Sequence, residues 1–515
     1  MKDAAVSTEN VAELKSRIAE LEILVKYYEE QFRLAKHRQF GASSEKSEYD
    51  QLNMFNEAEA TADANVPEPE LIEIERHYRK RTRLVNDRLP EYLPVEVVEH
   101  DLPADEQFCP ECGGPLHVMG REKRRELVIV PAQVKIREHV RKVYTCRECE
   151  KDEYGAPILK AAVDESVIKG SFASPEAIAH IMTQKFVMGM PLYRQEQEWK
   201  RQGIEISRQT ISNWVLRATE DWLEPIYDVL HEMLCNHDVL HADETTLQVL
   251  HEPGKTPQSK SYMWLYRTSG DAVHPIVLYE YQPDRRAKRP AAFLEGFKGY
   301  LHTDGYDGYH GLPKEIMVVG CWAHVRRKFD EALKALPEKD RIGSEALQGK
   351  RFCDRLFALE RNFEKMSPDE RFKARQKQSK PVMDEFFMWA EHSSALPKVP
   401  LGKAIRYALD QRRYLERYLL DGRLEFSNNR AERSIKPFVI DRKNFLFANT
   451  ARGAKASAVM FSLIETAKEN GLNPFKYLTY IFENAPNWDI RNSLNMMDLL
   501  IPHLMSDARR AELSN

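Results

Sequence analysis

Apolar residues recur near the start of the chain in alternating steps of three and four, with charged residues between them. They are Val11, Leu14, Ile18, Leu21, Val25, Tyr28, Phe32 and Ala35. Such steps form the heptad seam of a coiled coil, so the pattern predicts a short coiled coil over residues 8–40. A single amphipathic helix packed on its own domain would show the same stripe, and this alternative stays open.

Residues 41–90 have no apolar periodicity and predict a linker without a packed core. The stretch 51–75 carries seven acids and no Lys or Arg, and a basic cluster follows between Arg76 and Arg83. The basic cluster could contact phosphate groups, or it could form a solvated face.

The rest of the chain alternates between β-like and helical patterns, which predicts a multidomain protein with an α/β core. The apolar runs VLHAD, SYMWLYRTS, HPIVLYEY, GYLHTD and IMVVG are typical of strands. The expected parts are a zinc-binding module over 91–152, a helical region over 171–233, the first part of the core over 234–340, a helical insertion over 341–425, the rest of the core over 426–470, and a C-terminal helical element over 471–515.

Composition fits a globular protein of about three domains. The 515 residues are 42% hydrophobic and 30% charged, and no apolar run approaches the roughly 20 residues that a membrane span needs. The N-terminus lacks the apolar segment of a secretion signal, so a cytoplasmic location is expected. The net charge of -4 argues against a nucleic-acid partner, but charge is segregated: residues 402–455 carry thirteen Lys or Arg against six acids.

Four of the seven cysteines form two CxxC pairs, Cys109 with Cys112 and Cys146 with Cys149. Four thiolates complete a tetrahedral zinc site without an open position, so a structural zinc ion is expected. A redox role would need only one pair, in a thioredoxin-like context that is absent. The stretch 121–142 between the pairs has eight basic residues against three acids, which suits either a DNA-contacting ribbon or a purely structural one.

A helix-turn-helix candidate lies in the helical region. One helix closes at Gly203, and Ser207 then caps RQTISNWVLRATEDWL. Ile211, Trp214 and Val215 are expected to face inward. The outward side chains would be Arg208, Gln209, Ser212 and Asn213, which could contact base edges or phosphates. Helix pairs of this kind are also ordinary scaffolding.

Two acids follow apolar runs, Asp243 after VLHA and Asp304 after GYLHT. Carboxylates at the tips of neighbouring strands would converge at one edge of a sheet. A third acid from a helix would complete the ligands of two Mg²⁺ (or Mn²⁺) ions, which can clamp the attacking and leaving oxygens of a phosphoryl transfer.

Glu432 in SNNRAERSIKPF is the candidate for this third acid, because Arg430, Arg433 and Lys436 surround it and would suit a DNA backbone. The rival acids are Glu244, Asp307, Asp441 and Glu465. We expect Glu244 and Asp307 to lie past the strand ends, in supporting or solvated positions. Single Asp residues at strand ends are also common as caps or turns.

The segment Cys321-Trp-Ala-His324 opens a helix after the strand IMVVG and continues into Arg326, Arg327 and Lys328. Cys321 and His324 would share one helical face and support the active site or contact the substrate strand. The basic run could reach phosphate. A half-buried Cys and His in a core helix is the simpler alternative.

These motifs resemble, in the same order along nearly the whole chain, the bacterial insertion-sequence transposases of the "IS sixty-six" type, with their TnpC-type transposase. The matching segments include CPECGG, GMPLYRQEQEWKRQG, HADETTLQV, LHTDGYDGY, CWAHVRRKFDEAL and SNNRAERSIKPFVIDRKNF. The resemblance implies a DDE transposase in which Asp243, Asp304 and Glu432 are the catalytic acids. It also implies a ribonuclease-H-like core with a helical insertion.

Such an enzyme would cut DNA at both ends of an insertion sequence and transfer the freed 3′-hydroxyl to target DNA, through water and then hydroxyl activation at two metal ions. A homo-oligomer is expected, since both ends must be cut together, and small accessory proteins encoded by the same element are possible partners. Two other functions remain open, a DNA-binding regulator with structural carboxylates and a nuclease that stops at hydrolysis.

Overall fold

The structure, a computed structural model, describes residues 134–145 and 158–514 and six helical residues near the N-terminus. The chain divides into two compact units, one of Met1–Ser43 with Val163–Asn515 and one of Ser44–Ala162. Within the described part of the chain, the helices are too short or too polar to cross a lipid bilayer.

Four residues of the predicted heptad seam are described. They are Leu21, Val25, Tyr28 and Phe32, and all four are helical and exposed. Exposed apolar side chains at these spacings suit the seam of a coiled coil. The other seam positions lie outside the described residues.

In the second unit, the described residues form an antiparallel pair of short strands, β1 (Val143–Thr145) and β2 (Ile158–Lys160). The predicted zinc ligands Cys109, Cys112, Cys146 and Cys149 lie outside the described residues.

Helices fill the region before the sheet: α3 (Pro175–Phe186), α4 (Leu192–Arg201), α5 (Arg208–Ala218) and α6 (Glu224–Cys235), with a π-helical turn at Thr219–Leu223. Ser174 and Ser207 cap α3 and α5 by accepting backbone N–H groups, as their side chains do at helix starts. Ile211, Trp214 and Val215 are buried, which confirms the expected inward face of α5.

A mixed sheet forms the centre of the α/β core, in the order β5-β4-β3-β6-β7. Its strands are β3 (Val239–His251), β4 (Lys260–Thr268), β5 (Val277–Gln282), β6 (Gly299–His302) and β7 (Ile316–Val319). The first three pair antiparallel, whereas β3, β6 and β7 pair parallel. All five apolar runs that the sequence identified as strands are therefore strands, and helix α7 (Lys288–Phe293) precedes β6.

Gly299 allows β6 to begin close against β3. Its backbone has φ +151°, and a Cβ atom there would lie 2.2 Å from the carbonyl oxygen of Asp238. A side chain at this position would push the two parallel strands apart, so this glycine sets the spacing on which the neighbouring acids depend.

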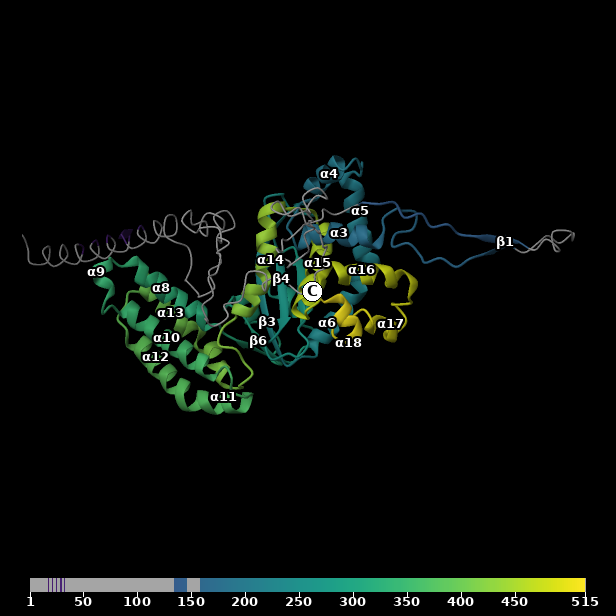
Figure 1. Ribbon diagram of the computed structural model, residues 1–515. Helices are drawn as coiled ribbons and strands as arrows, with labels where there is room; N and C mark the ends of the chain where they lie inside the picture. Colours follow the sequence, from purple (N-terminus) through teal and green to yellow (C-terminus); the bar gives the residue numbers. More distant parts are fainter. Residues whose placement is uncertain are drawn as a thin grey trace, which may run out of the picture. The chain divides into compact units, whose positions relative to one another are not determined.

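Helices between β7 and residue 419 form a bundle with its own apolar core around Trp322, Phe329 and Phe386. They are α8 (Trp322–Ala335), α9 (Glu338–Arg341), α10 (Glu345–Phe363), α11 (Pro368–Ala374), α12 (Lys380–His392) and α13 (Pro400–Leu415). A π-helical turn (Arg375–Ser379) leads into α12, and a 3-10 turn (Glu416–Leu419) follows α13. Figure 1 shows α8, α10, α12 and α13 side by side, in agreement with their contacts.

The remaining elements return to the sheet. They are α14 (Asn429–Phe445), β8 (Ala448–Thr450), α15 (Ala451–Glu469), α16 (Pro474–Asn484), α17 (Leu494–Asp498) and α18 (Asp507–Leu513). α15 covers the edge strand β5, where Ser462 and Thr466 accept the backbone N–H groups of Tyr279 and Val277 at 2.7 and 3.0 Å. These bonds satisfy an edge that would otherwise remain unpaired.

Candidate active site

Asp243 lies inside β3, not at its tip, so the expectation that a strand ends at this acid is wrong. The strand continues because β4 pairs with it through Gln248 and β8 pairs with it at Val249. What ends near Asp243 is the parallel neighbour β6, whose last pair joins His302 to His241. Beyond that pair, β3 pairs with no strand on this side until Val249, and Asp243 lies in this stretch.

Asp304 stands beside Asp243 when the β3–β6 register is continued by two residues. Its carboxylate accepts the backbone N–H of Tyr306 at 3.0 Å, and its carbonyl oxygen accepts the hydroxyl of Tyr407 at 2.9 Å. The turn after β6 and a helix of the insertion therefore both hold this acid in place.

Glu432 lies in the first turn of α14, where a carboxylate is favoured by the helix dipole. Fully buried Asn428 ties the start of this helix to β3. Its side-chain N–H donates to the carbonyl of Ala242 at 2.8 Å, and its side-chain oxygen lies 3.0 Å from Nδ1 of His241. Because that oxygen can only accept, Nδ1 of His241 carries the proton and donates it. The third acid is thus fixed against the strand that bears the first.

We expect Asn428→Ala to lower the free energy of unfolding by about 1–3 kcal/mol, since it leaves the buried Ala242 carbonyl and His241 N–H without partners. Urea denaturation measures the loss. Asn492→Ala removes an exposed amide that bonds only locally to Asp489, and it should change the value by less than about 0.5 kcal/mol. Equal effects of both substitutions would contradict the tie assigned to Asn428.

The three acids repel one another. Burial raises the pKa of half-buried Asp243 well above its usual range, and the charges of Glu244, Asp304 and Glu432 raise it further. Among the described residues, Asp243 and Asp304 have no ion pair to offset this repulsion. Oxygen ligands that hold excess negative charge are the donors that Mg²⁺ prefers, so the residues fit a divalent ion.

Glu244 was expected past the end of a strand, and this expectation is wrong. It lies inside β3, and its side chain is 1% exposed. It pairs with Arg285 and accepts the hydroxyl of Tyr309 at 2.6 Å. Burial raises its pKa, and the charge of Asp304 adds to this shift. The sequence shows the adjacent acid in HADET but not the Arg and Tyr that make it a buried anchor.

The other rival acids lie elsewhere. Asp307 is solvated, as expected, with its side chain 95% exposed. Asp441 is near Lys185 and Glu465, and burial raises its pKa to about 6. Glu465 forms an ion pair with Lys468 at 2.7 Å. None of the three is among the charges that act on Asp243.

Cys321 and His324 lie beside Glu432, where their ligand-type atoms are within 4.8 Å of one another. Cys321 precedes α8, and its buried Sγ accepts the backbone N–H of Asn428 at 3.1 Å. Burial raises the pKa of Cys321 to about 12 and lowers the pKa of His324. The structure thus joins the starts of α8 and α14 at the third acid.

The basic residues that were expected to contact DNA have different surroundings. Arg327 forms an ion pair with Glu432 at 3.2 Å, Arg326 with Asp354 at 2.5 Å, and Arg430 with Glu425 at 2.6 Å. Arg433 is exposed. Of the four candidate contacts on α5, Arg208, Gln209 and Asn213 are exposed and Ser212 is half-buried.

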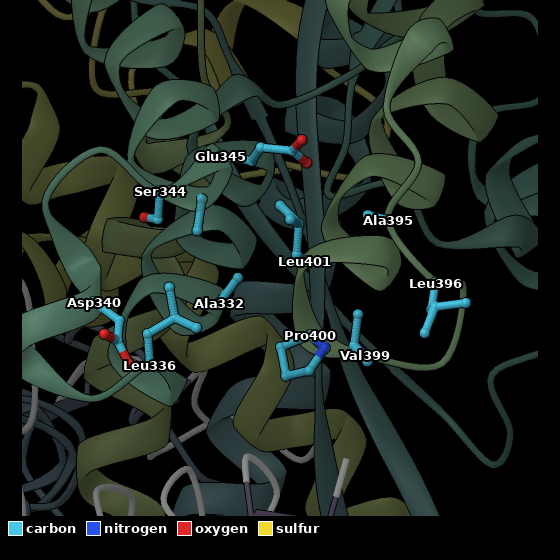
Figure 2. Close-up of a pocket in the computed structure, with 11 residues that line it drawn as sticks. Ala332, Leu336, Asp340, Ser344, Glu345, Ala395, Leu396, Val399, Pro400 and Leu401 are labelled. Carbon is cyan, nitrogen blue, oxygen red and sulfur yellow. The ribbon is translucent and has the colours of Figure 1, made fainter. Parts of the chain in front are cut away.

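A pocket of about 430 Å³ lies in the helical bundle (Figure 2). The residues that line it belong to the bundle helices and the loops between them. Its wall is mostly apolar, with Leu336 directly after α8, Leu396 in the loop before α13 and Leu401 in α13, and with Asp340 and Glu345 beside them. None of the acids or basic residues described above lines it, so the pocket is separate from the candidate site.

Comparisons with known proteins match most of the chain to one family. Residues 170–456, more than half of the chain, match the family described as "Transposase IS66 family", and residues 462–503 match "IS66 C-terminal element". Residues 106–150 match "zinc-finger binding domain of transposase IS66", which supports zinc binding, and residues 27–98 match "Transposase C of IS166 homeodomain".

Two relatives come from Sinorhizobium fredii. "Uncharacterized protein y4jD" is 31% identical over 430 residues, covering 80% of this chain and 81% of its own. "Uncharacterized protein y4qI" is 31% identical over 400 residues, covering 75% of this chain and 71% of its own. The family matches support a DNA-processing enzyme with DNA as its partner and confirm the resemblance that the motifs indicated: the chain belongs to the IS66 family of transposases.

Proposed function

We propose that this chain is a DDE-type transposase in which Asp243, Asp304 and Glu432 hold two Mg²⁺ ions. The observation that carries the proposal is geometric: the β3–β6 register brings Asp304 beside Asp243, and Asn428 fixes the start of α14, which bears Glu432, against the same strand. Two of the acids have no ion pair among the described residues, so a bound cation would relieve their repulsion. The central position of β3 in a mixed sheet supports the ribonuclease-H-like core that the family resemblance implies.

The surrounding residues would position the DNA strand. When bound, the metal pair supplies an activated water and clamps the attacking and leaving oxygens during in-line displacement. Arg327, Arg430 and Arg433 are at or near the third acid and suit the phosphate backbone. The exposed side chains of α5 would contact the element ends.

Parts outside the site complete the proposal. Cys109, Cys112, Cys146 and Cys149 would bind one structural zinc ion. The exposed residues of the heptad seam offer an interface for a second copy of the chain, which would bring both element ends together. Small accessory proteins encoded by the same element could join this assembly.

Incubation with Mg²⁺ and DNA that carries the element ends tests the function. We expect cleaved ends first and then products in which an end is joined to target DNA. Nicked products without joining would indicate a nuclease that stops at hydrolysis. Binding without any metal-dependent cleavage would indicate a DNA-binding regulator, and either result would overturn the proposal.

Metal binding should release protons at pH values between the usual Asp range and the raised pKa of Asp243. The pKa of Asp243 is raised, so the folded chain holds a proton there that a solution carboxylate would have lost, and a cation must displace it. Mg²⁺ affinity should therefore rise as pH rises. Calorimetry in buffers of different ionisation enthalpy measures the released protons.

Glu280→Gln provides a matched control for proton release. Burial raises the pKa of Glu280 to about 7, but Glu280 is not among the charges that act on Asp243. Release should persist in this variant and fall in Asp243→Asn. An affinity for Mg²⁺ that does not change with pH would contradict the assignment.

A further inference from the structure

Arg327 occupies the position of a cation between two ligand-type atoms. Its Nη2 donates to Oε2 of Glu432 at 3.2 Å, and its Nη1 lies 3.2 Å from Nε2 of His324. Since a guanidinium group can only donate, Nε2 of His324 accepts and has the free lone pair. One positive group thus bridges a carboxylate oxygen and an imidazole nitrogen.

The opposite atoms of the same two side chains lack partners. Nδ1 of His324 and Oε1 of Glu432 are buried without a hydrogen bond and lie 3.7 Å apart. With the lone pair on Nε2, the proton is on Nδ1 and points toward the carboxylate. If these two atoms moved slightly closer, Nδ1 of His324 would donate a hydrogen bond to Oε1 of Glu432. That bond would orient both side chains, with Nε2 and Oε2 directed at the position of the guanidinium.

Cys321 has a different part in this cluster. Its Sγ accepts the backbone N–H of Asn428, which links the start of α8, and so His324, to the start of α14, and so Glu432. This sulfur is occupied as an acceptor, and we regard Cys321 as a positioning residue.

We propose that His324, through Nε2, is a further ligand of the metal ion held by Glu432, and that Arg327 keeps this position in the metal-free chain. The inference rests on the proposed function and deepens it. An imidazole ligand makes the position more favourable for Mn²⁺, relative to Mg²⁺, than carboxylates alone would. The arriving ion displaces Arg327, and the freed guanidinium then becomes available to a DNA phosphate.

Pulsed electron paramagnetic resonance of bound Mn²⁺ tests the ligand directly. Mn²⁺ is added to the full chain with its cysteine sites loaded with zinc, which Mn²⁺ does not displace because it ranks lower in affinity. We expect coupling of Mn²⁺ to an imidazole nitrogen. His324→Gln should remove the coupling, whereas His251→Gln, at an exposed histidine beside Asn449, should keep it.

Mn²⁺ titration tests the competition. Arg327→Gln should tighten Mn²⁺ binding by about three- to fivefold, the size expected when one partly exposed ion pair no longer competes. Arg326→Gln removes the same charge from the preceding residue, whose side chain pairs with Asp354, and should leave the affinity unchanged. Unchanged or weaker binding in Arg327→Gln would overturn the competition.

The two levels of the proposal fail differently. If Asp243→Asn and Glu432→Gln bind Mn²⁺ as tightly as the unaltered chain, the proposed function fails. If both variants lose binding but the unaltered chain shows no imidazole coupling, only the role of His324 fails.

Discussion

Asp243→Asn is expected to reduce cleavage of the element ends by at least about a thousandfold, because it removes a metal ligand worth several kcal/mol of transition-state stabilisation. Binding of the ends should persist, since the exposed side chains of α5 and the basic residues of α14 are unchanged. A cleavage assay and a gel-shift assay on the same DNA measure the two activities separately.

The same substitution should stabilise the metal-free protein. The pKa of Asp243 is higher in the folded chain than in the unfolded chain, so the folded state binds more protons in the range between these values. This contribution to stability is therefore fully present below the usual Asp range, falls as pH rises above that range, and is lost once pH has passed the raised pKa of the folded chain. Asparagine stays neutral and also removes repulsion with Asp304 and Glu432, so the melting temperature above the usual Asp range should rise.

Asp307→Asn is the matched control, because this acid lies three residues after Asp304 but is 95% exposed. It should change neither cleavage nor melting temperature. Loss of cleavage together with loss of end binding in Asp243→Asn would indicate damage to folding. Normal cleavage in that variant would exclude Asp243 from the chemistry.

Arg375→Ala should destabilise the helical bundle by about 3–5 kcal/mol, the cost of leaving a buried partner charge unpaired. Arg375 is 1% exposed and bonds to Glu360 through two nitrogens, at 3.0 and 2.6 Å. It also donates to the carbonyls of Tyr418, Asp421 and Leu424 at 3.2, 3.0 and 2.8 Å. These carbonyls belong to the segment that leads into α14. Loss of the Arg375 hydrogen bonds should therefore also make this segment, and the start of the helix that bears Glu432, less ordered.

Urea denaturation followed by circular dichroism measures this loss. Arg355→Ala, which breaks an exposed pair with Glu385, should cost at most about 1 kcal/mol. The double substitution Arg375→Met with Glu360→Leu should recover part of the stability, since it removes both buried charges. If Arg375→Ala lowers the free energy of unfolding as little as Arg355→Ala does, Arg375 does not stabilise the helical bundle as proposed.

Much of the fold could be predicted locally. Strands β3 to β7 coincide with apolar runs, and Ser174, Pro175 and Ser207 mark helix starts whose caps the structure shows. Heptad steps, caps and apolar alternation depend on residues a few positions apart, so they can be read along the chain. Motif order was also enough to indicate the family.

The surroundings of the acids could not be predicted in this way. Asp243 was expected at a strand tip, but pairing with β4 and β8 extends β3, and only the shorter β6 opens an edge beside it. Glu244 was expected past the strand end, in a supporting or solvated position, because its partners, Arg285 and Tyr309, come from later segments.

The residues themselves determined which acids, histidines and arginines are available, and where helices and strands begin. Tertiary structure decided which of them meet. Asn428 contacts strand residues more than 180 positions earlier, and Arg327 reaches Glu432 across 105 positions. Such contacts form when parallel strands and a returning helix close long loops, and no local pattern records that closure.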